Sequence, residues 1–326
     1  MHARGHSLKG PVSILSARLR LTHPARSCGL SSRPALAVGL FHFHRSQPSH
    51  FFHASPPPPS PASMSEYPKH ARSTVHRYRP RASYDFSTIH AVVNSSPILH
   101  VSFLPSDPAD DPFPTILPMI GQMGSFSDPS ADPASEPLDL YIHGHAASRL
   151  MRLPSSQSTP PEGLPVCIAA TILDGIVLAL TPFNHSCNYR SAVIHGYATP
   201  VTDEEERLFG MRLITNGLVP DRWENSRVPP TQGEAQSTQI LKITVESASA
   251  KVRVGGPGNI RKDVMDAGVT GRVWTGVVPV WETLGELQEG EDNKVGKVPE
   301  YLEQWREGKN RMGKQYSYEV ARNEKE

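Results

Sequence analysis

Short runs of β-branched and apolar residues, separated by turn signals, constrain the fold of this chain more than any other feature. From Glu66 onward they return at intervals that suit a sandwich or barrel better than a doubly wound fold. Between two of them, Asp174-Gly175 predicts a tight hairpin, because glycine accepts the positive φ of such a turn. We expect mostly antiparallel strands at Ile98 to Leu104, Thr115 to Gly121, Leu138 to His143, Val166 to Leu173, Ile176 to Thr181, Ser191 to Thr199 and Gln239 to Glu246.

Two helices are expected between these strands, over residues 85–94 and from Asp203 to about Gly217. The second opens with the pattern of a capping box, with Thr202 as the N-cap and Glu205 at the third helical position. We expect both helices to pack outside the barrel.

Residues 1–65 differ in composition from the rest of the chain. No acidic residue precedes Glu66, whereas seven basic residues do, and a proline-rich run occupies residues 55–61. Such a segment has too little patterned apolar surface to offset the entropy of ordering, so we expect disorder. Its composition is also that of a mitochondrial presequence, and the alternative is that translation starts at Met64. The expected location is cytoplasmic, or mitochondrial if residues 1–63 are translated as a presequence.

Charge and composition argue against several classes of function. Residues 66–326 hold 26 basic and 32 acidic residues, a formal charge of −6 that repels a nucleic-acid backbone. The apolar runs fall short of the roughly 20 residues of a membrane-spanning helix, so a soluble chain is expected. Cys28, Cys167 and Cys187 lack the spacing of a disulfide framework or zinc site, and we expect reduced thiols. His143 and His145 share a strand face without an evident third ligand, so no metal site is predicted.

The first candidate site is the stretch 140–149, where a predicted strand enters a turn of small residues. Gly144 lets an anion approach the backbone, Ser148 offers a hydroxyl donor, and the guanidinium of Arg149 matches a phosphate. These residue types indicate phosphate binding. The alternative is a hairpin end whose Arg149 pairs with a surface carboxylate.

The second candidate is the stretch 183–191, the predicted connection between two strands. Asn188, Arg190 and Ser191 can hydrogen-bond a heteroaromatic ring or its ribityl chain. The ring of Tyr189 can lie against an apolar face. The alternative is a polar turn whose groups satisfy one another.

A third, weaker candidate follows further along the chain. Lys251 and Arg253 alternate onto one strand face before a turn at residues 255–258, which is no phosphate-binding P-loop because no Gly-Lys-Ser/Thr follows it. Trp274 is either a core residue or a ring that stacks on a ligand. No Gly-x-Ser-x-Gly elbow of a hydrolase occurs in the chain.

A resemblance to a known family rests on segments spread along the chain. In order, they are His143-Gly144, Ser148-Arg149, Cys167 to Leu180, Asn188-Tyr189-Arg190-Ser191, Pro220-Asp221-Arg222-Trp223, Ser249-Ala250-Lys251-Val252-Arg253 and Trp274-Thr275-Gly276-Val277-Val278-Pro279. Their combination resembles the pyridoxamine 5′-phosphate oxidase-like, FMN-binding split-barrel family, and more closely its branch of flavin-nucleotide-binding and nitroimidazole-resistance proteins. The resemblance runs from about Tyr67 to Trp281.

The resemblance implies a mainly β fold, namely a six-stranded antiparallel split β-barrel with peripheral helices. It also implies a homodimer with one FMN per subunit in a groove between the two barrels. The chain would then comprise a disordered tail or presequence (1–65), an FMN-binding split-barrel domain (66–285) and a charged C-terminal helix or tail (286–326).

Carried over by position, the resemblance also implies roles for single residues. Ser148 and Arg149 would hold the FMN phosphate, and His143 with Gly144 would line the isoalloxazine. The other residues would complete the pocket or reach it from the partner subunit: Asn188, Tyr189, Arg190, Ser191, Lys251, Arg253 and Trp274.

One departure bears on function. Pyridoxamine phosphate oxidases end in an Arg- and His-bearing segment that grips the substrate phosphate, whereas Trp274 is followed here by Thr-Gly-Val-Val-Pro-Val-Trp-Glu. We therefore expect an FMN-dependent oxidoreductase that acts on a small planar acceptor at the dimer interface, rather than an oxidase of vitamin B6. The alternative is a flavin-binding or redox-sensing module without turnover, and a third possibility is haem binding. The sequence assigns no catalytic residue, substrate or electron donor.

Overall fold

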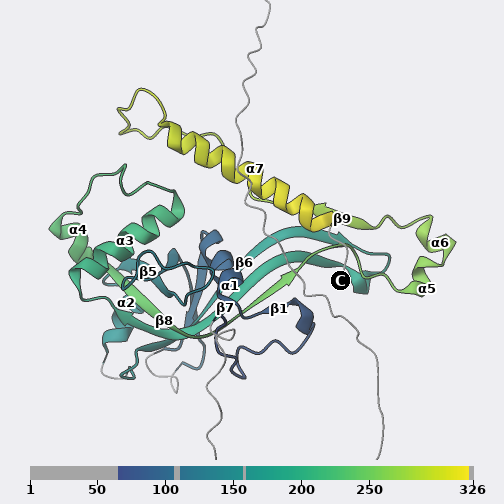
Figure 1. Ribbon diagram of the computed structural model, residues 1–326, viewed down its shortest axis with the longest axis horizontal. Helices are drawn as coiled ribbons and strands as arrows, with labels where there is room; N and C mark the ends of the chain where they lie inside the picture. The colour runs from purple at the N-terminus through teal and green to yellow at the C-terminus, as the bar shows by residue number, and fades with distance from the viewer. Residues whose placement is uncertain (1–64, 106–110, 157–158, 323–326) are drawn as a thin grey trace, which may run out of the picture. The chain divides into compact units, whose positions relative to one another are not determined.

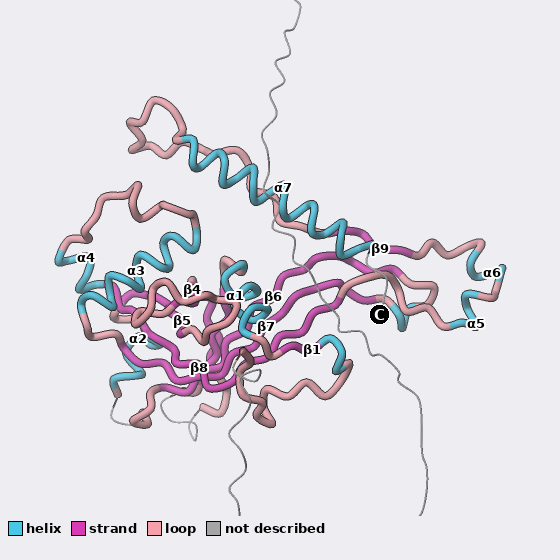
Figure 2. The backbone as a smooth tube through the Cα atoms, in the orientation of Figure 1, coloured by secondary structure: helices cyan, strands magenta, loops and turns pink. Residues whose placement is uncertain are grey.

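The computed structural model describes residues 65–105, 111–156 and 159–322. The disorder or presequence predicted for residues 1–65 therefore lies outside the described residues, except for Ser65. In the described part, one antiparallel sheet carries several helices around it (Figures 1 and 2), which confirms the mainly β fold. Its strands are β1 (Ala82–Ser83), β2 (Leu99–Phe103), β3 (Thr115–Met119), β4 (Gly121–Gly124), β5 (Asp139–His145), β6 (Leu164–Leu178), β7 (Ser186–Pro200), β8 (Thr238–Arg253) and β9 (Gly276–Pro279).

The sheet closes through one bent strand made of β3 and β4, which are separated by Ile120 alone. Strand β3 pairs with β2 and β4 pairs with β5, while the other strands follow in the order β2-β6-β7-β8-β5. Six strands thus form the barrel, with β3 and β4 taken as one, as expected. Alternate residues of β6 and β7 point inward, such as Ile168, Ala170 and Ile194, and pack in one buried core.

The hairpin predicted at Asp174-Gly175 is wrong. Strand β6 runs through both residues and pairs with β7 on either side of them, with a change of register between Leu173 and Gly175. The side chain of Asp174 is buried and binds Arg190 of β7, so this position is a bulge in a continuous strand. The chain reverses later, over residues 179–185, and β7 already begins at Ser186. Asn188 to Ser191 therefore lie in a strand and not in a connection.

The two predicted helices are present. Helix α1 begins after Asp85, whose carboxylate accepts a hydrogen bond from the Thr88 amide, and it packs its apolar side into the barrel core. Helix α3 is capped by Asp203, which accepts from the Glu206 amide, and not by Thr202 as predicted. The helices are α1 (Phe86–Ser95), α2 (Arg149–Arg152), α3 (Glu204–Leu218), α4 (Gln232–Ser237), α5 (Arg261–Val264), α6 (Ala267–Thr270) and α7 (Glu300–Arg322).

Helix α7 lies in the segment that was expected to be a charged helix or tail, and its last turns dock on the sheet. The hydroxyl of Ser317 donates to the carbonyl of Val280, just after β9, at 2.6 Å. The amide of Gly255, at the end of β8, donates to the carbonyl of Val320 at 2.9 Å. Both Ser317 and Val320 are buried. Within the described ranges, no helix has both the length and the apolar character needed to span a membrane.

Candidate functional site

The predicted site residues form two groups at opposite ends of β8. We call His143, Gly144, Ser148 and Arg149 the β5 corner. We call the residues 188–191 together with Lys251 and Arg253 the β7–β8 end. Gly144 pairs with residue 239 of β8 and Ser191 pairs with residue 251, which corresponds to roughly 40 Å of extended strand. A single chain therefore does not bring the two groups together, as the positions of α2 and β9 in Figure 1 illustrate.

At the β5 corner, Arg149 is the first residue of α2 and its side chain is exposed. No carboxylate within the described ranges forms an ion pair with it, so the surface pair considered as an alternative is not seen. Ser148 occupies the N-cap position, but its side chain makes no capping hydrogen bond. Both polar side chains thus remain available to a ligand.

Gly144 has a packing reason that the sequence did not reveal. A Cβ atom at this position would lie 2.7 Å from the terminal methyl carbon of Met151 and 3.4 Å from that of Met119. Because Met151 is buried, a larger residue at position 144 would have to displace the end of its side chain. The close approach of an anion is therefore not needed to explain this glycine.

His143 is half-buried, and its Nδ1 atom is buried without a hydrogen-bond partner in the described structure. Burial lowers the pKa of this imidazole below its usual value, so the ring is neutral at pH 7. A neutral imidazole with an unsatisfied nitrogen has one hydrogen bond to offer to a ligand.

The β7–β8 end uses its polar groups differently. The guanidinium of Arg190 binds the carboxylate of Asp174 through two hydrogen bonds, of 3.0 and 2.7 Å. Its other contact is the ring of Tyr316 from α7, whose centroid lies 4.1 Å from the Arg190 Cζ atom. The charge of Arg190 is therefore already balanced within the chain.

Asn188 and Arg253 form a second internal pair. Asn188 is fully buried, accepts a hydrogen bond from an Nη1–H of Arg253, and donates from Nδ2 to the carbonyl of Gly255 at 3.1 Å. Arg253 in turn donates from Nη2 to the carbonyl of Gly256 at 3.1 Å. Burial, reinforced by the nearby charge of Arg81, lowers the pKa of Arg253 from its usual value. The pair holds the turn that follows β8.

The remaining predicted residues point to the outside of the sheet. Ser191 and Lys251 are opposite each other in the β7–β8 ladder and both are half-buried, as is Tyr189. The hydroxyl of Ser191 donates to the carbonyl of Lys251 at 3.2 Å. Trp274 is 67% exposed and lies over Gly276, so it is not a core residue.

Sequence reasoning missed a row of polar groups on this outer face. Cys167, His195 and Ser247 are cross-strand neighbours on β6, β7 and β8, so they share a face. The sulfur of Cys167 lies 3.6 Å from Nε2 of His195. The Nδ1 of His195 and the hydroxyl of Ser247 are buried without partners in the described structure. Only the register of β6, β7 and β8 shows that these three residues are neighbours, and the sequence alone does not give that register.

The protonation states of this row argue against a nucleophile and base. Burial raises the pKa of the Cys167 thiol above its usual value. Burial, followed by the positive charge of Arg72, lowers the pKa of His195. Both groups are therefore neutral at pH 7, whereas an activated cysteine requires a thiolate. The row therefore contributes neutral groups, with one unsatisfied atom on the half-buried His195 and one on the fully buried Ser247.

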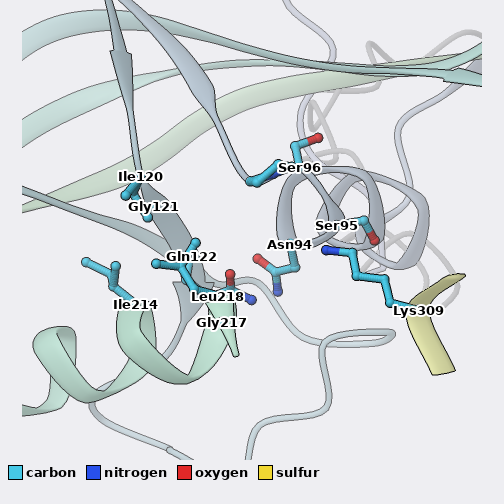
Figure 3. Close-up of a pocket in the computed structure, with 11 residues that line it drawn as sticks. Asn94, Ser95, Ser96, Ile120, Gly121, Gln122, Ile214, Gly217, Leu218 and Lys309 are labelled. Carbon is cyan, nitrogen blue, oxygen red and sulfur yellow. The ribbon is translucent and has the colours of Figure 1, made fainter. Parts of the chain in front are cut away.

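A small hollow lies elsewhere in the fold, between the end of α1, strand β4, the end of α3 and α7 (Figure 3). The amine of Lys309 points toward the end of α1, and the side chains of Asn94 and Gln122 line the same space. None of the residues singled out in the sequence lines this hollow.

Comparison with solved structures finds two proteins with a similar fold. The flavocytochrome Anf3 from Azotobacter vinelandii is 27% identical, with a TM-score of 0.58, over 74% of this chain and 99% of that chain. The FAD and heme binding protein from Mycobacterium smegmatis is 24% identical, with a TM-score of 0.56, over 69% of this chain and 97% of that chain. No curated protein matches the sequence.

The family itself is shown by sequence. The family description "Pyridoxamine 5′-phosphate oxidase" matches residues 85–252, which is more than half of the chain. This match spans the barrel from the N-cap of α1 almost to the end of β8, and it confirms the resemblance derived from the motifs. The chain belongs to the pyridoxamine 5′-phosphate oxidase family.

Proposed function

We propose that this protein binds a flavin nucleotide, FMN or FAD, and acts as a flavin-dependent oxidoreductase. The observation that carries the proposal is the match to a flavocytochrome over 99% of that protein's length. Membership of the pyridoxamine 5′-phosphate oxidase family supports it independently. A bound flavin supplies hydride and electron chemistry, while the protein binds and orients it.

The residues present fit such a ligand. At the β5 corner, the exposed guanidinium of Arg149 and the hydroxyl of Ser148 would hold the flavin phosphate. The unsatisfied Nδ1 of His143 would make a hydrogen bond to a polar atom of the ring system. At the outer sheet face, the unsatisfied Nδ1 of the half-buried His195 would offer a further hydrogen bond.

We also propose a homodimer, because the two groups of predicted residues lie too far apart for one small molecule. The β5 corner of one subunit and the outer face near Ser191 and Lys251 of the other would then form one site. Mixing Arg149→Ala with Lys251→Ala protein tests this arrangement. If each variant alone binds flavin weakly, heterodimers with one intact site restore strong binding to about a quarter of the sites. No recovery at all would contradict a shared site.

The test of flavin binding is direct. Purified protein is expected to show flavin absorbance, and mass analysis of the released ligand identifies FMN or FAD. Protein that is purified without colour is titrated with each flavin, and failure to bind either one overturns the proposal. A flavin-binding module without turnover is distinguished by anaerobic mixing with NADH or NADPH, since an oxidoreductase bleaches the flavin and an added acceptor then restores its colour faster than oxygen alone.

A haem is the second candidate cofactor, and the specific reason is that the solved relative with 27% identity is a flavocytochrome. Titration with hemin should then give a Soret band and a reducible spectrum at one haem per subunit. Absorbance without saturation at that ratio would mark nonspecific binding and exclude the haem.

A further inference from the structure

Three cations, Arg77, Arg81 and Lys251, gather around the ring of Tyr78 beside the β7–β8 end. We call them, together with Arg79, which follows Tyr78 in the chain, the basic patch. The Cζ atoms of Arg81 and Arg77 lie 4.4 and 5.1 Å from the centroid of the Tyr78 ring. The Nζ atom of Lys251 lies 6.0 Å from the same centroid. Positive side chains from two separate parts of the chain thus meet at one ring.

Acidic residues do not neutralise this charge. Residues 67–84 hold five basic residues and no acidic residue. Within the described ranges, no ion pair involves any cation of the patch, whereas the neighbouring Lys69 and Arg72 are paired with Glu66 and Glu246. The positive field also reaches Arg253, whose lowered pKa reflects burial first and the charge of Arg81 second. Converging cations without a carboxylate attract an anion.

The position of Tyr78 is also unusual. Its φ of 57° and ψ of 54° place a bulky residue in the left-handed region, just before the 3-10 turn Arg79–Arg81. Its side chain remains 52% exposed. Backbone conformations of this kind cost free energy and concentrate at functional sites. In this chain, the residue with the strained backbone is Tyr78, whose partly exposed ring lies among cations.

The patch is continuous with the outer sheet face. Strand β1 pairs Ala82 with Lys251, so the segment that carries the arginines is fixed directly to β8. Lys251 is also the cross-strand neighbour of Ser191. A ligand that binds at the outer face can therefore extend onto the patch.

We propose that the basic patch binds the adenosine diphosphate part of a dinucleotide, with phosphates between the cations and the base stacked on Tyr78. Three arginines and a lysine supply more positive charge than the two negative charges of a dinucleotide's phosphates require, and the partly exposed ring of Tyr78 offers a nucleobase an aromatic contact. This inference rests on the proposed flavin-dependent function. Two ligands share the chemistry: FAD, and a pyridine dinucleotide that delivers electrons.

The experiment compares two double variants by calorimetry, with FMN, FAD, NADPH and ADP as probes. Arg79→Ala/Arg81→Ala removes two charges from the patch. The matched control, Lys69→Ala/Arg72→Ala, removes two charges from the same segment that already have acidic partners. Tyr78→Asn removes the ring with a residue that tolerates the left-handed conformation.

The patch variant is expected to lose at least tenfold in ADP affinity, while FMN binding stays within twofold and the control behaves like the parent protein. If ADP competes with FAD, the patch serves the flavin; if ADP competes only with NADPH, it serves the electron donor. Tyr78→Asn should weaken ADP binding by a smaller factor. Parent protein that binds FMN but not ADP, or equal ADP affinity in both double variants, overturns the inference and leaves the flavin proposal intact. Loss of all flavin binding in the parent overturns the proposed function instead.

Discussion

The β5 corner and the β7–β8 end contain similar polar residues, yet the fold treats them in opposite ways. At the β7–β8 end, Arg190 and Arg253 have buried partners within the chain, namely Asp174 and Asn188. At the β5 corner, Arg149 is exposed, without an ion-pair partner in the described ranges. An arginine in a promising motif is thus a ligand-binding candidate only when the fold has not already satisfied it. Substitutions at the β7–β8 end should therefore lower the stability of the fold, whereas substitutions at the β5 corner should lower the affinity for flavin.

The largest effect is expected for Asn188→Ala. The change leaves the buried guanidinium of Arg253 and the carbonyl of Gly255 each without one hydrogen bond. We expect the free energy of unfolding to fall by about 3 kcal/mol, measured by urea denaturation. Cys187→Ala, on the exposed neighbouring side chain, should change it by less than about 0.5 kcal/mol. Similar losses in the two variants would contradict a structural role for Asn188.

The ion pair of Asp174 and Arg190 gives the next largest effect. Asp174→Ala leaves a guanidinium, of which a quarter is exposed, without its carboxylate, so we expect a loss of about 2.5 kcal/mol in stability. The double variant Asp174→Ala/Arg190→Met should be more stable than this single variant, because no unpaired charge remains. If the double variant also loses flavin affinity tenfold or more while folding normally, Arg190 is a ligand as well.

At the β5 corner, Arg149→Ala should act on binding alone. Loss of a hydrogen bond to a charged group predicts a decrease of about 2 kcal/mol in flavin affinity, roughly thirtyfold. Stability should change by less than about 0.5 kcal/mol, since the side chain is exposed. Arg152→Ala, on the exposed side of the same short helix, is the control and should bind flavin like the parent. Unchanged affinity in Arg149→Ala would move the phosphate site elsewhere.

The smallest expected effect is on the pH dependence of stability, and it arises from His90, which belongs to neither the β5 corner nor the β7–β8 end. His90 is buried in α1, with Nε2 2.7 Å from the hydroxyl of Tyr67 and Nδ1 2.7 Å from the carbonyl of Pro133. Burial lowers its pKa in the folded state. At a pH below the unfolded-state pKa of about 6.5, the unfolded chain therefore binds a proton that the folded chain does not bind. The free energy of unfolding decreases as the pH is lowered through this range.

Urea midpoints between pH 7.5 and 5.5 measure this slope. His90→Gln should flatten it without abolishing it, because burial also lowers the pKa values of His143 and His195. A slope in His90→Gln equal to that of the parent protein would show that His90 does not contribute.

Much of the fold could be predicted from the sequence because local patterns and tertiary packing agree along most of it. Runs of β-branched and apolar residues between turn signals predicted the barrel strands. Acidic N-cap residues mark both helices, although the cap of α3 is Asp203 and not Thr202. The hairpin prediction failed at Asp174, since a dipeptide typical of turns is equally suited to a bulge when an arginine on the next strand binds the aspartate.

The candidate site was less predictable, because it depends on register and on distance. The sequence could not show that β8 separates two motifs by its full length, or that Cys167 and His195 meet across two strands. It could have shown the basic patch, since residues 67–84 contain no acid in a barrel with more acidic than basic residues. The formal charge of −6, counted over residues 66–326, does not show this local excess of positive charge.

The docking of α7 has a practical consequence for anyone who shortens this protein. In a chain that ends before Tyr316, Arg190 would lose its contact with the Tyr316 ring. The Gly255 amide would lose its acceptor, the carbonyl of Val320, and the Val280 carbonyl would lose its donor, the hydroxyl of Ser317. Each of these lies at the tip of the long β6–β7–β8 ribbon, so proteolytic trimming should fray the ribbon from its tip and spare the barrel.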